Sequence, residues 1–269
     1  MKKTVFFVAL CAALTLCVSS AMAQAPASLL TLHPGVAGQD NGVRTPGAPK
    51  YCKPCLYYGG DWASTDSNWV AFANADGWAF GGPVDMWSGF TVPKGKTWTV
   101  TGLVSNNLFY NIDHFTPSTP EWSINKGMAA GKAGKVVAHG ETKGTAAATG
   151  RSCCSNIYVE YSVIVKKLPK AVKLAAGKYT TMITPPCDST KDSACGSALS
   201  YESDTYDPNN TNKQGANHFG PKAPAGYNFQ NSSVFGLNYT QINAAYCTSV
   251  GYQPYACNFM SAGVMGTQK

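Results

Sequence analysis

The chain has 269 residues, of which 44% are hydrophobic and only 13% are charged, and its formal net charge is +7. This composition is typical of a folded globular protein and excludes an intrinsically disordered chain, in which hydrophobic content would be low and net charge high. The positive charges are spread along the sequence and no nucleic-acid-binding motif accompanies them, so we expect no nucleic-acid partner.

Residues 1–23 have the features of a secretory signal peptide. Lys2 and Lys3 precede an apolar run at 5–18, and Ala-Met-Ala at 21–23 provides the small residues of a cleavage site. The apolar run is short for a membrane span, and no later stretch is both long and apolar enough to be one. We therefore predict a secreted or periplasmic protein without membrane insertion.

The rest of the chain is predicted to consist of an arm and one domain. Residues 24–50 are rich in Ala, Pro and Gly and contain few large apolar side chains, which is typical of a flexible linker or a loosely docked arm. The folded domain is expected over 51–269, a length that is sufficient for a sizeable hydrophobic core.

Short segments enriched in β-branched and aromatic residues, separated by Gly, Pro and Asn turns, predict that this domain is all-β. A strand at 98–103 is expected after a turn at 93–96, and another at 178–184 after a turn at 175–177. The clearest strand is 157–165, where apolar side chains alternate with mostly polar ones. A period of two residues is difficult to reconcile with a helix.

No window of a dozen residues has convincing helical periodicity, and only 240–245 has the pattern of a single helical turn. Several short strands with turns at this spacing predict a β-sandwich, and we favour a jelly-roll-like arrangement over a barrel. The densest basic stretch, 166–173, lies between two predicted strands. It is typical of a solvated strand and turn, and the alternative is a surface that binds an anionic polymer.

Export affects how the cysteines are interpreted, because thiols pair in oxidising compartments. Outside the signal peptide there are eight, which fits four disulfides: Cys52, Cys55, Cys153, Cys154, Cys187, Cys195, Cys247 and Cys257. Proximity in sequence predicts the bonds Cys187–Cys195 and Cys247–Cys257. Adjacent cysteines are poorly placed to bond each other, so we expect the pair at 153–154 to bond to Cys52 and Cys55. The alternatives are a redox pair at 52–55 and a zinc site formed by these four cysteines.

Four tryptophans fall between residues 62 and 87, interleaved with Gly, Asn and Asp. Exposed tryptophans on a β-sandwich stack against sugar rings, which would make the protein a carbohydrate-binding module. We expect such a platform at Trp62 or Trp78, with Asp61 and Asp76 as the neighbouring hydrogen-bonding groups. The alternative is that these tryptophans fill the core and pack the loops.

An acidic segment at 202–210 gathers oxygen ligands, chiefly Glu202, Asp204 and Asp207, densely enough to predict calcium binding. Its spacing differs from that of an EF-hand loop, so a plain polar loop is the alternative. No other cofactor is expected.

Catalytic motifs are missing from the sequence. It contains neither G-x-S-x-G nor H-E-x-x-H, and the four histidines are scattered. Two carboxyl groups facing across a sugar would suffice for a glycosidase, and Glu160 with Asp85 or Asp113 with Glu121 are possible pairs. A secreted jelly-roll hydrolase or lyase is therefore the alternative to a binding protein.

Several motifs resemble a group of uncharacterised bacterial exported β-sandwich proteins, whose members often carry surface-anchor tails. They are LYYGGD at 56–61, FTVP at 90–93 followed by WTVTG at 98–102, EWSI at 121–124, LAAGKY at 174–179, SSVFG at 232–236 and the stretch 259–266. The resemblance implies export and a β-sandwich fold, and no catalytic residues. The expected role is a non-catalytic binding or structural one, either with polysaccharide as the partner or as a self-associating matrix or surface protein.

Overall fold

The computed structural model describes residues 49–61, 71–74, 84–110, 119–153, 158–185, 199–201, 217–233, 235–250 and 257–269 of the chain. The predicted signal peptide lies outside these residues, as does the predicted arm except for its last two positions.

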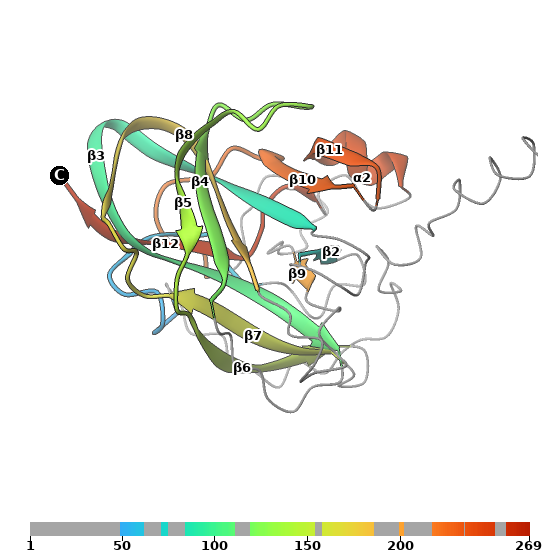
Figure 1. The fold of residues 1–269 in the computed structure, drawn as a ribbon, viewed down its shortest axis with the longest axis horizontal. Helices are drawn as coiled ribbons and strands as arrows, with labels where there is room; N and C mark the ends of the chain where they lie inside the picture. The colour runs from blue at the N-terminus through green and yellow to red at the C-terminus, as the bar shows by residue number, and fades with distance from the viewer. Residues whose placement is uncertain are drawn as a thin grey trace, which may run out of the picture.

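The described part of the chain is almost entirely β-structure, which confirms the all-β prediction (Figure 1). Its strands join in one 12-stranded sheet whose pairings are antiparallel. They are β1 (Cys55–Tyr58), β2 (Ala71–Ala73), β3 (Asp85–Tyr110), β4 (Glu121–Lys126), β5 (Lys135–Glu141), β6 (Thr145–Cys153), β7 (Tyr158–Val165), β8 (Val172–Thr184), β9 (Leu199–Tyr201), β10 (Asn228–Ser232), β11 (Leu237–Ile242) and β12 (Ala262–Gln268). None of the helices in the described residues has the length and apolar character needed to cross a membrane.

β3 is the central strand, because it pairs with β7, β8, β9, β10 and β12. Its register with β8 shifts between Val92, which lies opposite Gly177, and Thr97, which lies opposite Ala175. β3 and β8 curve together at this point, and the sheet folds over on itself (Figure 1). The predicted turns at 93–96 and 175–177 are therefore wrong as chain reversals, since each strand continues through its bend.

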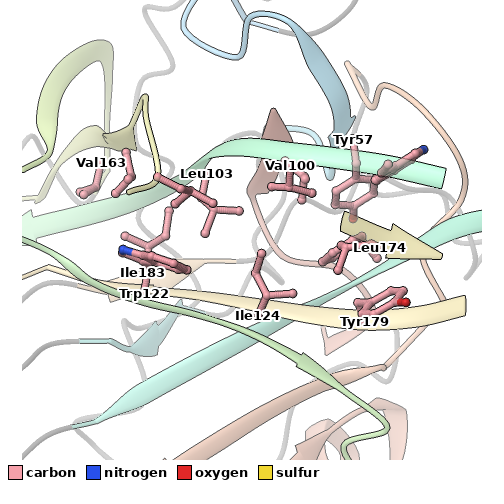
Figure 2. Close-up of a cluster of buried hydrophobic side chains, with 14 of the residues drawn as sticks. Tyr57, Val100, Leu103, Trp122, Ile124, Val163, Leu174, Tyr179 and Ile183 are labelled. Atoms are coloured by element: carbon pink, nitrogen blue, oxygen red, sulfur yellow. The ribbon is translucent and has the colours of Figure 1, made fainter. Parts of the chain in front are cut away.

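The main core lies between the two layers that this fold-over creates. Figure 2 shows side chains from the second half of β3 and from β7 facing side chains from β4 and from the second half of β8. The labelled residues are Tyr57, Val100, Leu103, Trp122, Ile124, Val163, Leu174, Tyr179 and Ile183, all of them buried. Because the two faces bury each other, the sheet behaves as a two-layer sandwich. Its jelly-roll-like arrangement stays a prediction.

The predicted strand at 157–165 is confirmed by β7, which buries both of its faces. Tyr161 and Val163 point into the main core. Ile164, on the opposite face, packs with Cys52 in a smaller apolar cluster, and Glu160 is fully buried on that same face. The polar positions of this strand are thus interior positions rather than solvent-facing ones.

The predicted helical turn at 240–245 is shifted along the chain. Residues 240–242 belong to β11, and the helix α2 (Ala244–Ser249) begins after Asn243. The Asn243 side chain caps this helix by accepting a hydrogen bond from the Tyr246 backbone N–H at 3.0 Å. The capping residue therefore determines where the helix starts, and the apolar pattern of the sequence alone does not reveal this position.

Two disulfides occur within the described residues. Cys247–Cys257 confirms the predicted sequence-near pair. Cys52 bonds to Cys55, with a Cα–Cα distance of 4.9 Å, so the predicted bonds from these two residues to Cys153 and Cys154 are wrong. Paired in this way, Cys52 and Cys55 have no thiolates to offer a zinc ion.

The sheet register explains why Cys153 cannot reach this pair. Through β12, Cys55 is level with Gly102 of β3, whereas through β7, Cys153 is level with Tyr110. The eight residues between these levels span roughly 26 Å of strand, far beyond the reach of a disulfide. Cys154, Cys187 and Cys195 lie outside the described residues.

Candidate functional site

A cleft of about 470 Å³ opens where β5 faces the segment that links β7 to β8. This volume lies in the range of small-molecule sites. We refer to it as the β5 cleft. It is lined by Trp122, Val137, Ala138, His139, Pro169, Lys170, Ala171, Val172 and Lys173.

The first wall of the β5 cleft is a loop that the sheet forces outward. β7 and β8 pair with the same side of β3, with Val165 opposite Leu103 and Val172 opposite Val100. Six residues, 166–171, must therefore pass beside only two residues of β3, and they loop out. The backbone passes so close to Gly102 that a Cβ there would lie 2.6 Å from the Val165 carbonyl oxygen.

The loop is anchored at its centre. The Leu168 backbone N–H donates a 2.8 Å hydrogen bond to the Thr101 carbonyl oxygen, and the Leu168 side chain is buried in the main core. Its neighbours Pro169 and Lys170 are exposed and line the β5 cleft. The anchor therefore fixes the position of the residues that form this wall.

The second wall is β5, which pairs only with β4 among the described strands. The register shifts where Ala138 lies opposite Ile124 and Val136 opposite Asn125, so Val137 is a bulged residue between them. Bulges re-aim side chains at the edge of a sheet. Here the bulge places Val137, Ala138 and His139 together along the β5 cleft.

Trp122 lies at the base of the β5 cleft and is only 3% exposed. Its indole N–H donates a 2.9 Å hydrogen bond to the Thr142 hydroxyl. Its ring packs against β5 at Gly140, where a Cβ would lie 3.3 Å from the indole Cζ2. The tryptophan is therefore a fixed, mostly buried base and not an exposed stacking platform.

The lining of the β5 cleft carries positive charge and no negative charge. Lys170 and Lys173 are exposed and His139 is exposed opposite them, and the lining contains no Asp or Glu. The remaining lining groups are apolar or backbone. This arrangement suits a ligand that has one apolar face and carries negative charge at its edge.

A second polar feature surrounds Asp61, a residue of the predicted carbohydrate site. Asp61 is 3% exposed, and its carboxyl oxygen Oδ2 accepts hydrogen bonds from Arg151 Nη1 at 2.8 Å and from Asn217 Nδ2 at 2.6 Å. Tyr58 donates its hydroxyl to Oδ1. Both oxygens are thus bonded to protein groups.

Arg151 also binds Glu160 through Nε and Nη2, so two acidic side chains share one guanidinium. We refer to Asp61, Arg151 and Glu160 as the buried ion cluster. Tyr51 lies beside it and donates to Asn106 Oδ1 at 3.3 Å. Burial, and then the nearby Glu160 and Asp61, raise the pKa of the Tyr51 hydroxyl above its ordinary value, while its hydrogen bonds oppose the shift.

The other predicted ligand and metal residues lie outside the described part of the chain. These are Trp62, Trp78, Asp76, Glu202, Asp204 and Asp207. The described residues contain no group of three or more His, Cys, Asp or Glu side chains that could hold a metal ion. The sugar platform and the calcium site stay predictions.

Two other predictions from the sequence concern residues that the structure describes. Trp87, one of the four clustered tryptophans, is a core residue whose indole N–H donates to the Ser123 hydroxyl at 2.9 Å. The proposed carboxyl pair of Glu160 and Asp85 is engaged elsewhere, since Glu160 binds Arg151 and Asp85 accepts a 3.0 Å hydrogen bond from Thr184.

Sequence reasoning missed the partners of Asp61 and the base of the β5 cleft. One signal was available: the chain has only two arginines, Arg44 and Arg151, among many lysines. An arginine in a lysine-rich sequence favours a bidentate bond to a carboxyl group. No comparable signal marks Trp122.

Comparison of the chain with protein-family models, with curated proteins and with solved structures finds no significant match.

Proposed function

We propose that the protein is a secreted or periplasmic, non-catalytic binding protein for polysaccharide, and that a glycan chain lies in the β5 cleft. The observation that carries this proposal is the combination of a largely apolar interior with a few polar groups at the rim. Sugar rings present apolar faces and polar edges, so such a lining suits them. The two disulfides support an oxidising compartment outside the cytoplasm.

The β5 cleft also has the rigidity that a binding site needs. One wall is held by the buried Leu168, and the base is held by the hydrogen-bonded Trp122. Because these residues are fixed before the ligand arrives, little conformational entropy is lost on binding. A pre-formed site of this kind favours binding over a structural role.

The test is retention of the purified mature protein on a panel of soluble and insoluble polysaccharides. Ala171→Trp places a bulky side chain at an exposed position in the β5 cleft and should abolish retention. Ala130→Trp, at an exposed position in the turn between β4 and β5, is the matched control and should bind as the wild type does. Both variants should keep the wild-type melting temperature.

The same panel includes Trp62→Ala and Trp78→Ala, which remove the platform predicted from sequence. Loss of retention in these variants, with Ala171→Trp unaffected, would move the site to that platform. Release of new reducing ends during incubation would favour the hydrolase alternative. Absence of retention on every glycan would contradict the proposal.

A second candidate function, self-association, is favoured by β6. Among the described strands β6 pairs only with β7, and residues 145–150 carry no charged side chain. An uncharged edge strand is a template for pairing with another chain. Light scattering across a concentration series should then show oligomers for the wild type and not for Ala148→Lys.

A further inference from the structure

We infer that the β5 cleft is specific for acidic polysaccharide, whose anionic groups are held by Lys170 and Lys173. This inference rests on the proposed function, because it takes the β5 cleft as the glycan site. It goes beyond it by naming the chemical class of the glycan.

Lys170 and Lys173 have no acidic partner among the residues that the structure describes. Both are exposed, both line the β5 cleft, and no acidic side chain shares the lining with them. Within the described residues neither lysine makes an ion pair or a cation–π contact. Lys126, by comparison, has its ammonium group 5.4 Å from the centre of the Tyr179 ring, which is a cation–π contact. Two unpaired ammonium groups at one cleft attract an anion and disfavour a neutral ligand.

The cleft wall holds the backbone of both lysines in place. Lys173 belongs to β8, where it lies opposite Thr99 of β3, so its backbone is fixed by the sheet. Lys170 stands two residues after the anchored Leu168. Both lysine side chains therefore extend from fixed backbone positions and not from a free tail. The distance between these positions limits the spacing of the two charges along the ligand.

Two further lysines on the loop favour a polymer over a small anion as the ligand. Lys166 and Lys167 are exposed on the same loop and are not part of the lining of the β5 cleft. The positive charge thus continues beyond the cleft along the loop. A polyanion gains from every charge on this track, while a monosaccharide anion reaches only those in the cleft.

Because part of the lining is apolar, we expect the β5 cleft to bind its ligand through apolar contact as well as through charge. Val137, Ala138 and Val172 line the β5 cleft and pack, partly buried, against the core cluster that contains Trp122. The apolar C–H face of a sugar ring can cover such side chains while its carboxylate or sulfate group reaches an ammonium group. The recognised unit is therefore a sugar ring with an anionic substituent.

The experiment measures the affinity of the mature protein for polygalacturonate, dextran sulfate and neutral dextran. The first carries its negative charge on carboxylates and the second on sulfates, so the two polymers separate these sources. Lys170→Gln/Lys173→Gln should weaken binding to the acidic polymer on the order of tenfold. The control Lys94→Gln/Lys96→Gln removes the same charge from exposed positions on β3 and should bind as the wild type does.

Four outcomes are distinguishable. Binding to an acidic polymer that weakens in the cleft variant, weakens with added NaCl and persists in the control supports the inference. Equal weakening in both double variants overturns it, because the attraction would be a property of the overall charge. Binding to dextran that Ala171→Trp abolishes, without preference for acidic polymers, overturns it and keeps the proposed function. No binding to any polymer overturns both.

Discussion

Arg151 of β6 donates hydrogen bonds to both carboxyl oxygens of Glu160, which lies on the neighbouring strand β7. The same guanidinium reaches Asp61, which lies 90 residues earlier in the chain. All three side chains are buried. The only arginine of the predicted domain therefore joins the segment after β1 to the β6–β7 pair.

Removal of this guanidinium is expected to destabilise the fold severely. Arg151→Met leaves two buried acidic side chains without their cation, and breaking a buried ion pair in this way lowers the free energy of unfolding by about 3–5 kcal/mol. Urea denaturation followed by tryptophan fluorescence measures the loss. Lys143→Met, at an exposed position near β6, is the control and should change stability by less than about 0.5 kcal/mol.

The triple variant Asp61→Asn/Arg151→Met/Glu160→Gln separates charge burial from packing. It removes all three charges together, so it should recover part of the stability that Arg151→Met loses. A triple variant less stable than the single one would show that the network's hydrogen bonds, and not its uncompensated charges, dominate.

His218 should make stability depend on pH. Burial lowers its pKa below the ordinary value, the charge of Lys222 adds to this effect, and the hydrogen bond with the Pro221 carbonyl opposes it. The unfolded chain therefore binds a proton that the folded chain resists, and stability falls as pH drops below about 6.5.

Urea denaturation at pH 7.5 and pH 5.0 tests this expectation. His218→Gln should lose less stability between the two values than the wild type does. Equal losses in both proteins would mean that other groups cause the pH dependence.

Peptide mapping of the unreduced protein should identify the bonds Cys52–Cys55 and Cys247–Cys257. Replacing Cys247 and Cys257 together by serine opens a loop with a sequence separation of 10. In the chain-entropy model this lowers the free energy of unfolding by about 2.5–3 kcal/mol. Detection of a peptide linking Cys52 to Cys153 would contradict the register of the β1–β12–β3 and β3–β7–β6 pairings.

Gly89 should tolerate no side chain. A Cβ there would lie 2.3 Å from the Tyr227 carbonyl oxygen, which is backbone and cannot swing away. Gly89→Ala should therefore lower stability by about 1–3 kcal/mol. Gly140→Ala is the comparison, because its nearest contact is the Trp122 side chain at 3.3 Å, and its effect on the melting temperature should be smaller.

Features that depend on residues close together in the sequence were predicted better than features that depend on pairing between distant segments. The strand at 157–165 was predicted correctly, because alternation along one strand needs no knowledge of its partners. The segment 93–96 was predicted as a turn from its Pro and Gly, and it is a bend in a continuous strand. What holds it is β8, which follows β3 on both sides of the bend and comes much later in the sequence.

The candidate site was harder to predict for the same reason. The β5 cleft combines Trp122 of β4 with a loop that starts at residue 166, and no spacing rule relates them. Asp61 was singled out for a ligand, yet its partners Arg151 and Asn217 are 90 and 156 residues away. By contrast, the basic stretch 166–173 was visible at once, and its alternative interpretation as a surface for an anionic polymer is the one now proposed.

The position of β12 has a consequence for how the protein is made. This strand is formed by residues 262–268 and lies between β1 and β3, so the sheet stays incomplete until the last strand is available. Pairings between segments so distant in sequence form slowly, because a long loop must close before any contact stabilises it. A chain that is still being synthesised thus lacks the strand that pairs with both β1 and β3. The β1–β12 and β3–β12 pairs can close only after residues 262–268 have been synthesised, so they are among the last pairings of the sheet to form.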